Sequence, residues 1–206
     1  MQSKDHWEHV YSTKAADTVS WFQPHADVST RLIRASGLGR DASIVDVGGG
    51  ASTLADDLLE AGYKNLTVLD LSFAALTEAQ NRLGKRASQV RWLEGDITQV
   101  KFEPHSFDLW HDRAVFHFLT SAEERASYVK QVLHALKPGG YVMMATFGAN
   151  GPTQCSGLPV VRYTPDALHS EFGDEFLMTS NEEQLHHTPF GTDQQFIYCM
   201  CRMLPA

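Results

Sequence analysis

The sequence lacks any long run of apolar residues. No stretch of its 206 residues approaches the roughly 18 consecutive apolar positions that a membrane span requires. The first nine residues also contain no apolar segment of the kind that forms a secretory signal. We therefore expect a cytoplasmic, soluble protein that has no membrane partner.

Cysteine and positive charge are both scarce. Three cysteines are too few and too irregularly spaced for a disulfide framework, so we expect buried thiols. The formal net charge of −8 argues against a nucleic-acid partner, because such binding depends on clustered lysine and arginine. No set of histidine, cysteine and carboxylate side chains has metal-ligand spacing, so we expect no metal. Without repeats or linkers, residues 1–206 predict a single domain, as a monomer or homodimer.

Glycine is concentrated at one informative place. Residues 43–52 read SIVDVGGGAS, a β-branched run that is followed by a glycine cluster and then by an amphipathic stretch over 54–61. This order predicts a strand, a tight turn and a helix, which is where open α/β sheets bind nucleotide-like ligands. Glycine permits a positive φ and lets the backbone approach a ligand closely.

Two motifs compete for this turn. The dinucleotide pattern G-x-G-x-x-G fits Gly48 and Gly50, but Thr53 stands in place of its third glycine. The pattern of acid, x, Gly, x, Gly fits better and begins at Asp46. It resembles the first motif of class I S-adenosylmethionine-dependent methyltransferases, with Ser52 in place of that motif's last glycine. Taken alone, the turn leaves a methyltransferase, a dinucleotide binder and a structural bend all open.

The rest of the chain alternates strand-like and helix-like segments. Predicted strands cover residues 66–70, 90–93, 107–111 and 141–147, and predicted helices cover 73–83 and 121–136. Beyond them we expect a short helix over 164–172 and two strands over 175–183 and 195–203. The alternation predicts a parallel sheet with helices on both faces. The closing hairpin is similar to the class I methyltransferase architecture: an α/β, Rossmann-like three-layer sandwich with a mostly parallel seven-stranded sheet and an antiparallel last strand.

Further motifs follow at matching positions. Asp70 ends the second strand, where an acid accepts ribose hydroxyls of either S-adenosylmethionine or a dinucleotide. The runs EGDI at 94–97, FDLWHDR at 107–113 and LKPGGY at 136–141 resemble later methyltransferase motifs. The resemblance implies S-adenosyl-L-methionine as the cofactor and S-adenosylhomocysteine as the product. The residues that it implies as cofactor contacts are Asp46, Gly48, Gly49, Gly50, Asp70, Leu71, Asp96, Ile97 and His111.

Aromatic residues gather before the first strand. We expect residues 1–40 to form a helical extension, in which Trp7, Tyr11 and Trp21 either cap the apolar edge of the sheet or form a lid. In the lid interpretation these rings attract the sulfonium cation and wall the methionine end of the cofactor. Similar segments precede the core in methyltransferases that act on small molecules and in those that modify elongation-factor lysines.

Candidate catalytic residues lie at and beyond the fourth strand. His111 and His117 are possible general bases, and Asp112 is a possible partner that orients one of them. Packed histidines and a helix-capping carboxylate are the structural alternatives. Arg113 either contacts a substrate anion or pairs with Asp108 or Asp112.

The predicted units are a cofactor-binding core at 41–147 and a substrate-side loop with closing hairpin at 148–206. The loop is rich in Gly, Pro and Ser, and we expect Cys155 and Arg162 in it to line the substrate pocket. A reactive role for the Cys155 thiol is the competing reading, although methyl transfer requires none.

The predicted function is methyl transfer to a small-molecule substrate, for example a thiol or another soft nucleophile. The alternatives are a protein lysine methyltransferase, a non-catalytic cofactor-binding relative and a nicotinamide enzyme.

Overall fold

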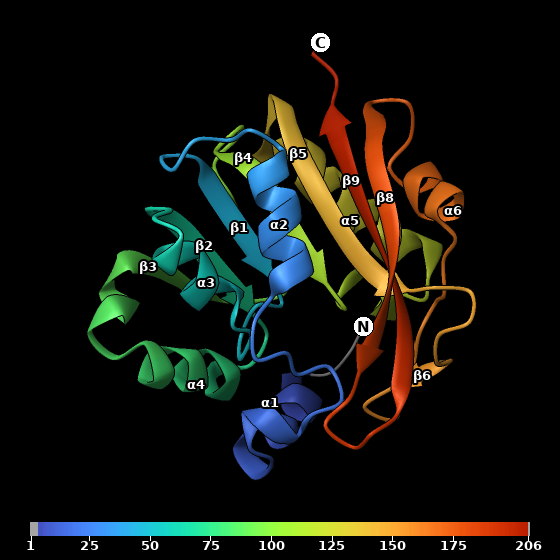
Figure 1. Cartoon of the computed structure of the whole chain (residues 1–206). Helices are drawn as coiled ribbons and strands as arrows, with labels where there is room; N and C mark the ends of the chain where they lie inside the picture. Colours follow the sequence, from blue (N-terminus) through green and yellow to red (C-terminus); the bar gives the residue numbers. More distant parts are fainter. Residues whose placement is uncertain (1–3, 206) are drawn as a thin grey trace.

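The computed structural model of the protein describes residues 4–205, which form one large sheet with helices on both faces (Figure 1). The strand order is β3-β2-β1-β4-β5-β9-β8. These strands are β1 (Ser43–Val47), β2 (Asn65–Asp70), β3 (Val90–Glu94), β4 (Phe107–Arg113), β5 (Leu136–Phe147), β8 (Phe176–His187) and β9 (Asp193–Met203). The helices are α1 (Lys4–Thr13), α2 (Asp27–Ala35), α3 (Leu54–Glu60), α4 (Phe73–Leu83), α5 (Ala122–Ala135) and α6 (Pro165–Ser170).

Pairing within the sheet confirms the predicted fold class. Strands β1 to β5 pair in parallel, and β9 lies antiparallel between β5 and β8. The strand order reverses between β1 and β4, so the loops after these two strands diverge there. Open α/β sheets bind ligands in the crevice that such a switch point leaves.

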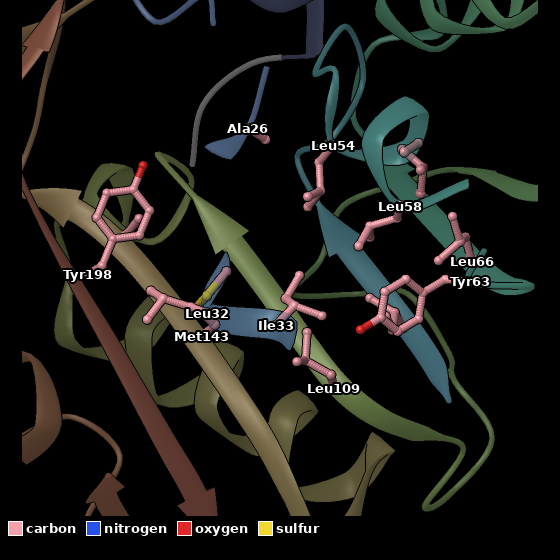
Figure 2. Packing of buried hydrophobic residues seen from close by; sticks show 14 of the residues in the cluster. Ala26, Leu32, Ile33, Leu54, Leu58, Tyr63, Leu66, Leu109, Met143 and Tyr198 are labelled. Carbon is pink, nitrogen blue, oxygen red and sulfur yellow. The ribbon is translucent and has the colours of Figure 1, made fainter. Parts of the chain in front are cut away.

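Each face of the sheet has its own apolar core. Ile44 of β1 packs in the layer under α2 and α3, while its neighbour Val45 packs in the opposite layer with α5. Figure 2 shows Ile33 of α2 and Leu58 of α3 among buried side chains of the first layer. Because side chains alternate along a strand, nearly continuous apolar strands cover both layers.

Helix starts follow the polar residues expected as caps. Ser72 accepts a hydrogen bond from Ala75 N at the start of α4. Ser121 and Glu124 form the predicted capping box of α5. Thr164 caps α6 from the position before Pro165. Each of these three helices thus begins where a side chain accepts a hydrogen bond from one of its first backbone N–H groups.

Most element boundaries differ from the predicted ones by no more than two residues, and three differences are larger. Strand β5 begins at Leu136, because residues 137–140 form an irregularity within its pairing to β4 rather than a separate turn. The final strands extend to His187 and from Asp193, so only residues 188–192 connect them. The loop after β5 contains a small hairpin, β6 (Gln154–Cys155) and β7 (Leu158–Pro159), that was not predicted.

The predicted N-terminal extension contains helices α1 and α2, apart from residues 1–3, which lie outside the described part. In Figure 1, α1 lies at the end of the sheet toward which β1 and β4 point, and α2 crosses one face. None of the helices between residues 4 and 205 combines the length and apolar character needed to cross a bilayer.

Candidate functional site

Two adjoining hollows lie at the carboxyl ends of β1, β2 and β4. The larger is bounded by β1, β2 and β4 and roofed by α1, residue 21 and the β6–β7 hairpin. The smaller reaches the glycine bend and the segment before α2. Four residues line both and connect them: Tyr11, Trp21, Gly48 and Arg113. The switch point of the sheet therefore opens into a continuous cavity whose lining includes aromatic side chains of the N-terminal extension.

The glycine bend leaves no room for side chains. Gly48 has a φ of 68°, and a Cβ there would lie 2.0 Å from Cγ2 of Val115. A Cβ at Gly49 would lie 2.2 Å from Asp46 Oδ2, and one at Gly50 2.5 Å from Asp70 Oδ2. The bend thus presents bare backbone to the smaller hollow, as a cradle for a carboxylate-bearing ligand requires.

Asp70 lines the larger hollow at the end of β2. Its Oδ2 accepts a hydrogen bond from Gly50 N at 3.0 Å, and its Oδ1 accepts one from Ser72 N at 2.8 Å. Burial raises the pKa of the Asp70 carboxyl to about 6. These contacts hold the carboxylate where it can accept further hydrogen bonds from hydroxyl groups.

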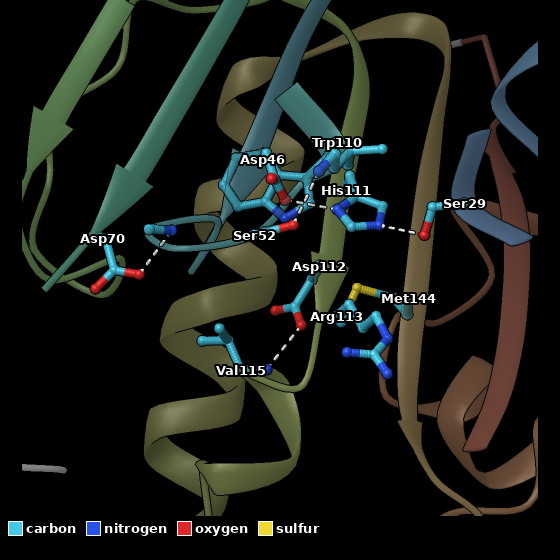
Figure 3. Close-up of polar contacts among 12 residues, drawn as sticks. Ser29, Asp46, Ser52, Asp70, Trp110, His111, Asp112, Arg113, Val115 and Met144 are labelled. Carbon is cyan, nitrogen blue, oxygen red and sulfur yellow. Dashed lines mark hydrogen bonds and ion pairs between the residues drawn. The ribbon is translucent and has the colours of Figure 1, made fainter. Parts of the chain in front are cut away.

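A buried chain of hydrogen bonds, which we call the relay, joins β1, β4 and α2 (Figure 3). His111 Nδ1 lies 2.6 Å from Asp46 Oδ1, and His111 Nε2 lies 2.9 Å from Ser29 Oγ. The three residues are 2%, 5% and 1% exposed, respectively. The carboxylate favours a proton on Nδ1, and in the neutral imidazole Nε2 then accepts from the Ser29 hydroxyl. Asp46 Oδ2 has no hydrogen-bond partner within the described chain.

This relay changes the interpretation of His111. The imidazole borders the smaller hollow, but both its nitrogens are engaged by protein groups. Ser29 was not identified from the sequence, because a serine within an amphipathic helix has no distinguishing pattern.

Asp112 and His117 line neither hollow. The Asp112 carboxylate accepts hydrogen bonds from Val115 N at 3.0 Å and from the Tyr128 hydroxyl at 2.6 Å, which matches the capping alternative. Burial raises the pKa of Asp112 to about 6. The ring of His117 packs against Phe147 at 4.7 Å, and burial lowers the pKa of His117 to about 3. Both residues are therefore poorly placed for proton transfer to a bound acceptor.

Arg113 extends under the roof of the cavity instead of pairing with a neighbouring acid. Its Nε donates to the Tyr198 hydroxyl at 3.0 Å, and one terminal nitrogen donates to Trp21 O at 2.9 Å. The guanidinium lies 4.4 Å from the ring centre of Phe196. Asp108, one of the expected partners, pairs with Lys137 at 2.8 Å.

The N-terminal aromatics belong to the cavity wall. Trp21 Nε1 donates to the Tyr11 hydroxyl at 3.0 Å, and the Trp7 ring packs edge-on against Phe118 at 5.3 Å. Burial raises the pKa of the Tyr11 hydroxyl, which stays protonated. The aromatic extension thus covers the cavity as well as the apolar edge.

Helix α1 is held in place by polar contacts. Glu8 Oε2 accepts hydrogen bonds from Ser72 Oγ at 2.8 Å and from Ala74 N at 3.3 Å, at the start of α4. Lys4 pairs with Glu94 at the end of β3. The two contacts place α1 across the openings after β2 and β3.

The loop after β5 contributes one predicted residue to the cavity and not the other. Cys155 lines the larger hollow, and burial raises the pKa of its thiol to about 12. Arg162 is exposed and instead donates to Ala149 O at 2.8 Å. The arginine therefore braces the loop from outside.

Only part of the predicted motif after β3, residues 94–97, lines the cavity. Ile97 and Gly95 line the larger hollow, as does Leu71 after β2. Asp96 lies outside the lining residues and accepts from Thr98 N and Oγ at 2.8 Å. Within residues 4–205 no cluster of three histidine, cysteine or carboxylate residues is arranged to hold a metal ion.

Comparison with known proteins identifies the same segment. Residues 44–140 match a family model described as a methyltransferase domain. The mouse (Mus musculus) eEF1A lysine and N-terminal methyltransferase is 23% identical over 141 residues, which cover 68% of this chain and 20% of that protein. This chain thus spans about a fifth of that relative's length. Human (Homo sapiens) EEF1A lysine methyltransferase 2 is 24% identical over 190 residues, covering 84% of this chain and 74% of the relative.

Solved structures share the fold over nearly the whole chain. One, from work on the conversion of a disulfide bond into a thioacetal group during echinomycin biosynthesis, has a TM-score of 0.80 and 18% identity, covering 98% of this chain and 93% of that chain. Another is the 1,6-didemethyltoxoflavin-N1-methyltransferase of Burkholderia thailandensis with its substrate and S-adenosylhomocysteine, with a TM-score of 0.67 and 19% identity. That match covers 98% of this chain and 84% of that chain.

Proposed function

Because this chain belongs to the class I S-adenosylmethionine-dependent methyltransferases, we propose that it transfers the cofactor's methyl group to a small-molecule acceptor. The glycine bend, from which any Cβ would project into Asp46, Asp70 or Val115, fits the family's cofactor. One further feature agrees with this fit: the unpartnered Asp46 Oδ2 can accept a hydrogen bond from an amino group.

We assign each part of the cofactor to the groups that would bind it in one of the two hollows. The backbone at Gly48 to Gly50 holds the methionine end, and Asp70 accepts the ribose hydroxyls beside Leu71 and Ile97. His111 and Ser29 position Asp46 rather than exchange protons with the acceptor. When bound, S-adenosylmethionine supplies a methyl group that its sulfonium charge already activates.

The remaining catalytic task is to position the acceptor and exclude water. Tyr11 and Trp21 line both hollows and Trp7 lines the larger one, and the faces of these rings attract a cation. Within the described residues, 4–40 act as the lid, 41–147 hold the cofactor, and 148–205 complete the acceptor side. Three buried free thiols suit a reducing compartment such as the cytoplasm.

One observation carries the small-molecule proposal: the aromatic roof covers the cavity from two directions. Helix α1 closes it on one side and the β6–β7 hairpin on the other, and His6 Nε2 lies 3.1 Å from Ser156 Oγ where the two meet. A hollow that is covered on two sides in this way suits a free small molecule better than a segment of folded protein.

Protein lysine methylation is the second candidate, and its support is the sequence similarity to two methyltransferases of eEF1A. Cell extract supplied with methyl-labelled S-adenosylmethionine and the purified protein separates the two. Label in small extractable species supports the proposed function, whereas label confined to a protein band supports lysine methylation. No enzyme-dependent label in either fraction would favour a non-catalytic relative.

A further inference from the structure

Arg113 is a partly buried cation without an anionic partner among the described residues. Its guanidinium contacts Trp21 O and the Tyr198 hydroxyl and lies over the Phe196 ring, all of which are uncharged. Its second terminal nitrogen is buried and has no hydrogen-bond partner in residues 4–205. Withdrawing a guanidinium from water into such surroundings costs free energy unless a group of opposite charge pairs with it.

The carboxylates adjacent to Arg113 or lining the hollows form hydrogen bonds with other groups. Asp112, the adjacent acid, binds backbone N–H groups and Tyr128, and Figure 3 shows the two side chains diverging. Asp46 and Asp70 line the hollows on the side of the glycine bend, where His111 and backbone N–H groups hold them. Among described residues Arg113 makes no ion pair.

The other titratable groups near Arg113 are neutral. Cys155 lines the same hollow with its thiol protonated, since burial raises the thiol pKa to about 12. His117 and His186, whose pKa values burial lowers, feel the arginine's charge and remain unprotonated near neutral pH. Where the two hollows join, the described lining residues are Tyr11, Trp21, Gly48 and Arg113, so the one formal charge among them is positive and lies beside aromatic rings.

We propose that Arg113 selects an anionic acceptor, such as an aromatic thiolate, and holds it in the cavity. This inference rests on the proposed function and specifies the substrate class. Arg113 lines both hollows, so an anion bound to it lies where the cofactor site and the aromatic roof meet. A lysine ammonium would be repelled there.

An anionic acceptor also needs no general base, which agrees with the engagement of His111 by Asp46 and Ser29 among the described lining residues. The acceptor's lone pair forms the new bond to the methyl carbon, and the electron pair of the broken carbon–sulfur bond stays on sulfur. The acceptor's negative charge and the sulfonium's positive charge cancel, so no proton has to leave. Arg113 favours the ionised acceptor before transfer.

Calorimetric binding of three ring compounds to the protein–S-adenosylhomocysteine complex tests this role without turnover. The probes are benzoate (anionic), benzyl alcohol (neutral) and benzylamine (cationic). We expect benzoate to bind at least about tenfold more tightly than the other two. In Arg113→Met this preference disappears while the affinity for S-adenosylhomocysteine changes less than about twofold, and Arg113→Lys retains part of it.

Arg40→Met is the matched control, because Arg40 also lies over an aromatic ring, that of Tyr63 at 4.5 Å, but is exposed and outside both hollows. It should leave all three affinities unchanged. Benzylamine or benzyl alcohol binding as tightly as benzoate would overturn the proposal. Loss of S-adenosylhomocysteine binding in folded Arg113→Met and Arg113→Lys would also overturn it, since Arg113 would then hold the cofactor. Failure of the unaltered protein to bind S-adenosylhomocysteine would instead contradict the proposed function.

Discussion

Gly48 combines a left-handed backbone with a neighbour that leaves no space for a side chain. In Gly48→Ala the new Cβ would meet Val115 Cγ2 at 2.0 Å, whereas Gly62, with a φ of 87°, has no atom within 4 Å of its Cβ position. We expect Gly48→Ala to lose about 2–4 kcal/mol of unfolding free energy and its S-adenosylhomocysteine binding. Gly62→Ala shares only the backbone strain and should lose about 1 kcal/mol. Urea unfolding and calorimetry measure both, and equal effects of the two changes would contradict the assignment of the bend.

Asp70 gives cofactor binding a pH dependence. Its pKa in the free protein is raised to about 6, and ribose hydroxyls donate more strongly to the ionised form, so binding releases a proton below that pH. The affinity for S-adenosylhomocysteine should therefore be level above about pH 7 and fall roughly tenfold by about pH 5. Asp70→Asn should bind more weakly without this decline. Asp112, with a pKa also near 6, is retained in that variant, so a decline that persists would assign the effect elsewhere.

Residues in local motifs were easier to predict than residues that depend on distant partners. Asp46, Gly48, Gly49 and Asp70 follow directly from strand and turn patterns, and the structure places them around the hollows. Gly50, predicted with them, lines neither hollow and instead donates to Asp70. The engagement of His111 by Ser29 could not be predicted, because 82 residues separate the two in the chain. The exposure of Arg162 likewise depends on how its loop folds.

At the scale of elements, α1 depends on its contact with the start of α4. Glu8→Gln removes the charge that the N–H groups and dipole of α4 favour, a change of about 0.5–1 kcal/mol. We expect amide hydrogens of α1 to exchange about two- to fivefold faster and S-adenosylhomocysteine to dissociate faster by a similar factor. Hydrogen exchange and stopped-flow displacement measure these two rates.

Glu123→Gln provides the control, because Glu123 lies in the first turn of α5 and is exposed, away from the cavity. It removes a comparable interaction with a helix N-terminus but should leave exchange in α1 and cofactor release unchanged. Unaltered release in Glu8→Gln would show that α1 does not limit access to the site.

The ends of a helix were predicted nearly correctly where the local sequence contains both a capping residue and a periodic apolar pattern. Helix α4 matches its predicted range, and α5 begins at the predicted box. Strands β8 and β9 run beyond their predicted ends because β8 is an edge strand, whose polar side chains face solvent and hide the alternation. Helix α1 has a weak apolar pattern, since its aromatic residues face the cavity rather than a conventional core.

At the scale of the whole molecule, strand order decides where the site lies. The reversal between β1 and β4 gathers residues from four separate segments, and the N-terminal extension closes over them. The order of motifs along the chain was sufficient to predict this topology. The sequence left open whether Arg113 contacts a substrate anion or pairs with a neighbouring acid, because the choice depends on the surroundings of Arg113 in three dimensions.

The most direct test of the account is thermal unfolding with S-adenosylhomocysteine and, separately, with NADH. At a concentration about 100-fold above its dissociation constant, a ligand of the folded state contributes about 2.7 kcal/mol, which for a chain of this size raises the Tm by roughly 5–10 °C. We expect S-adenosylhomocysteine to produce this shift and NADH to produce none. A shift with NADH and none with S-adenosylhomocysteine would contradict the assignment of the cavity as a methyl-donor site.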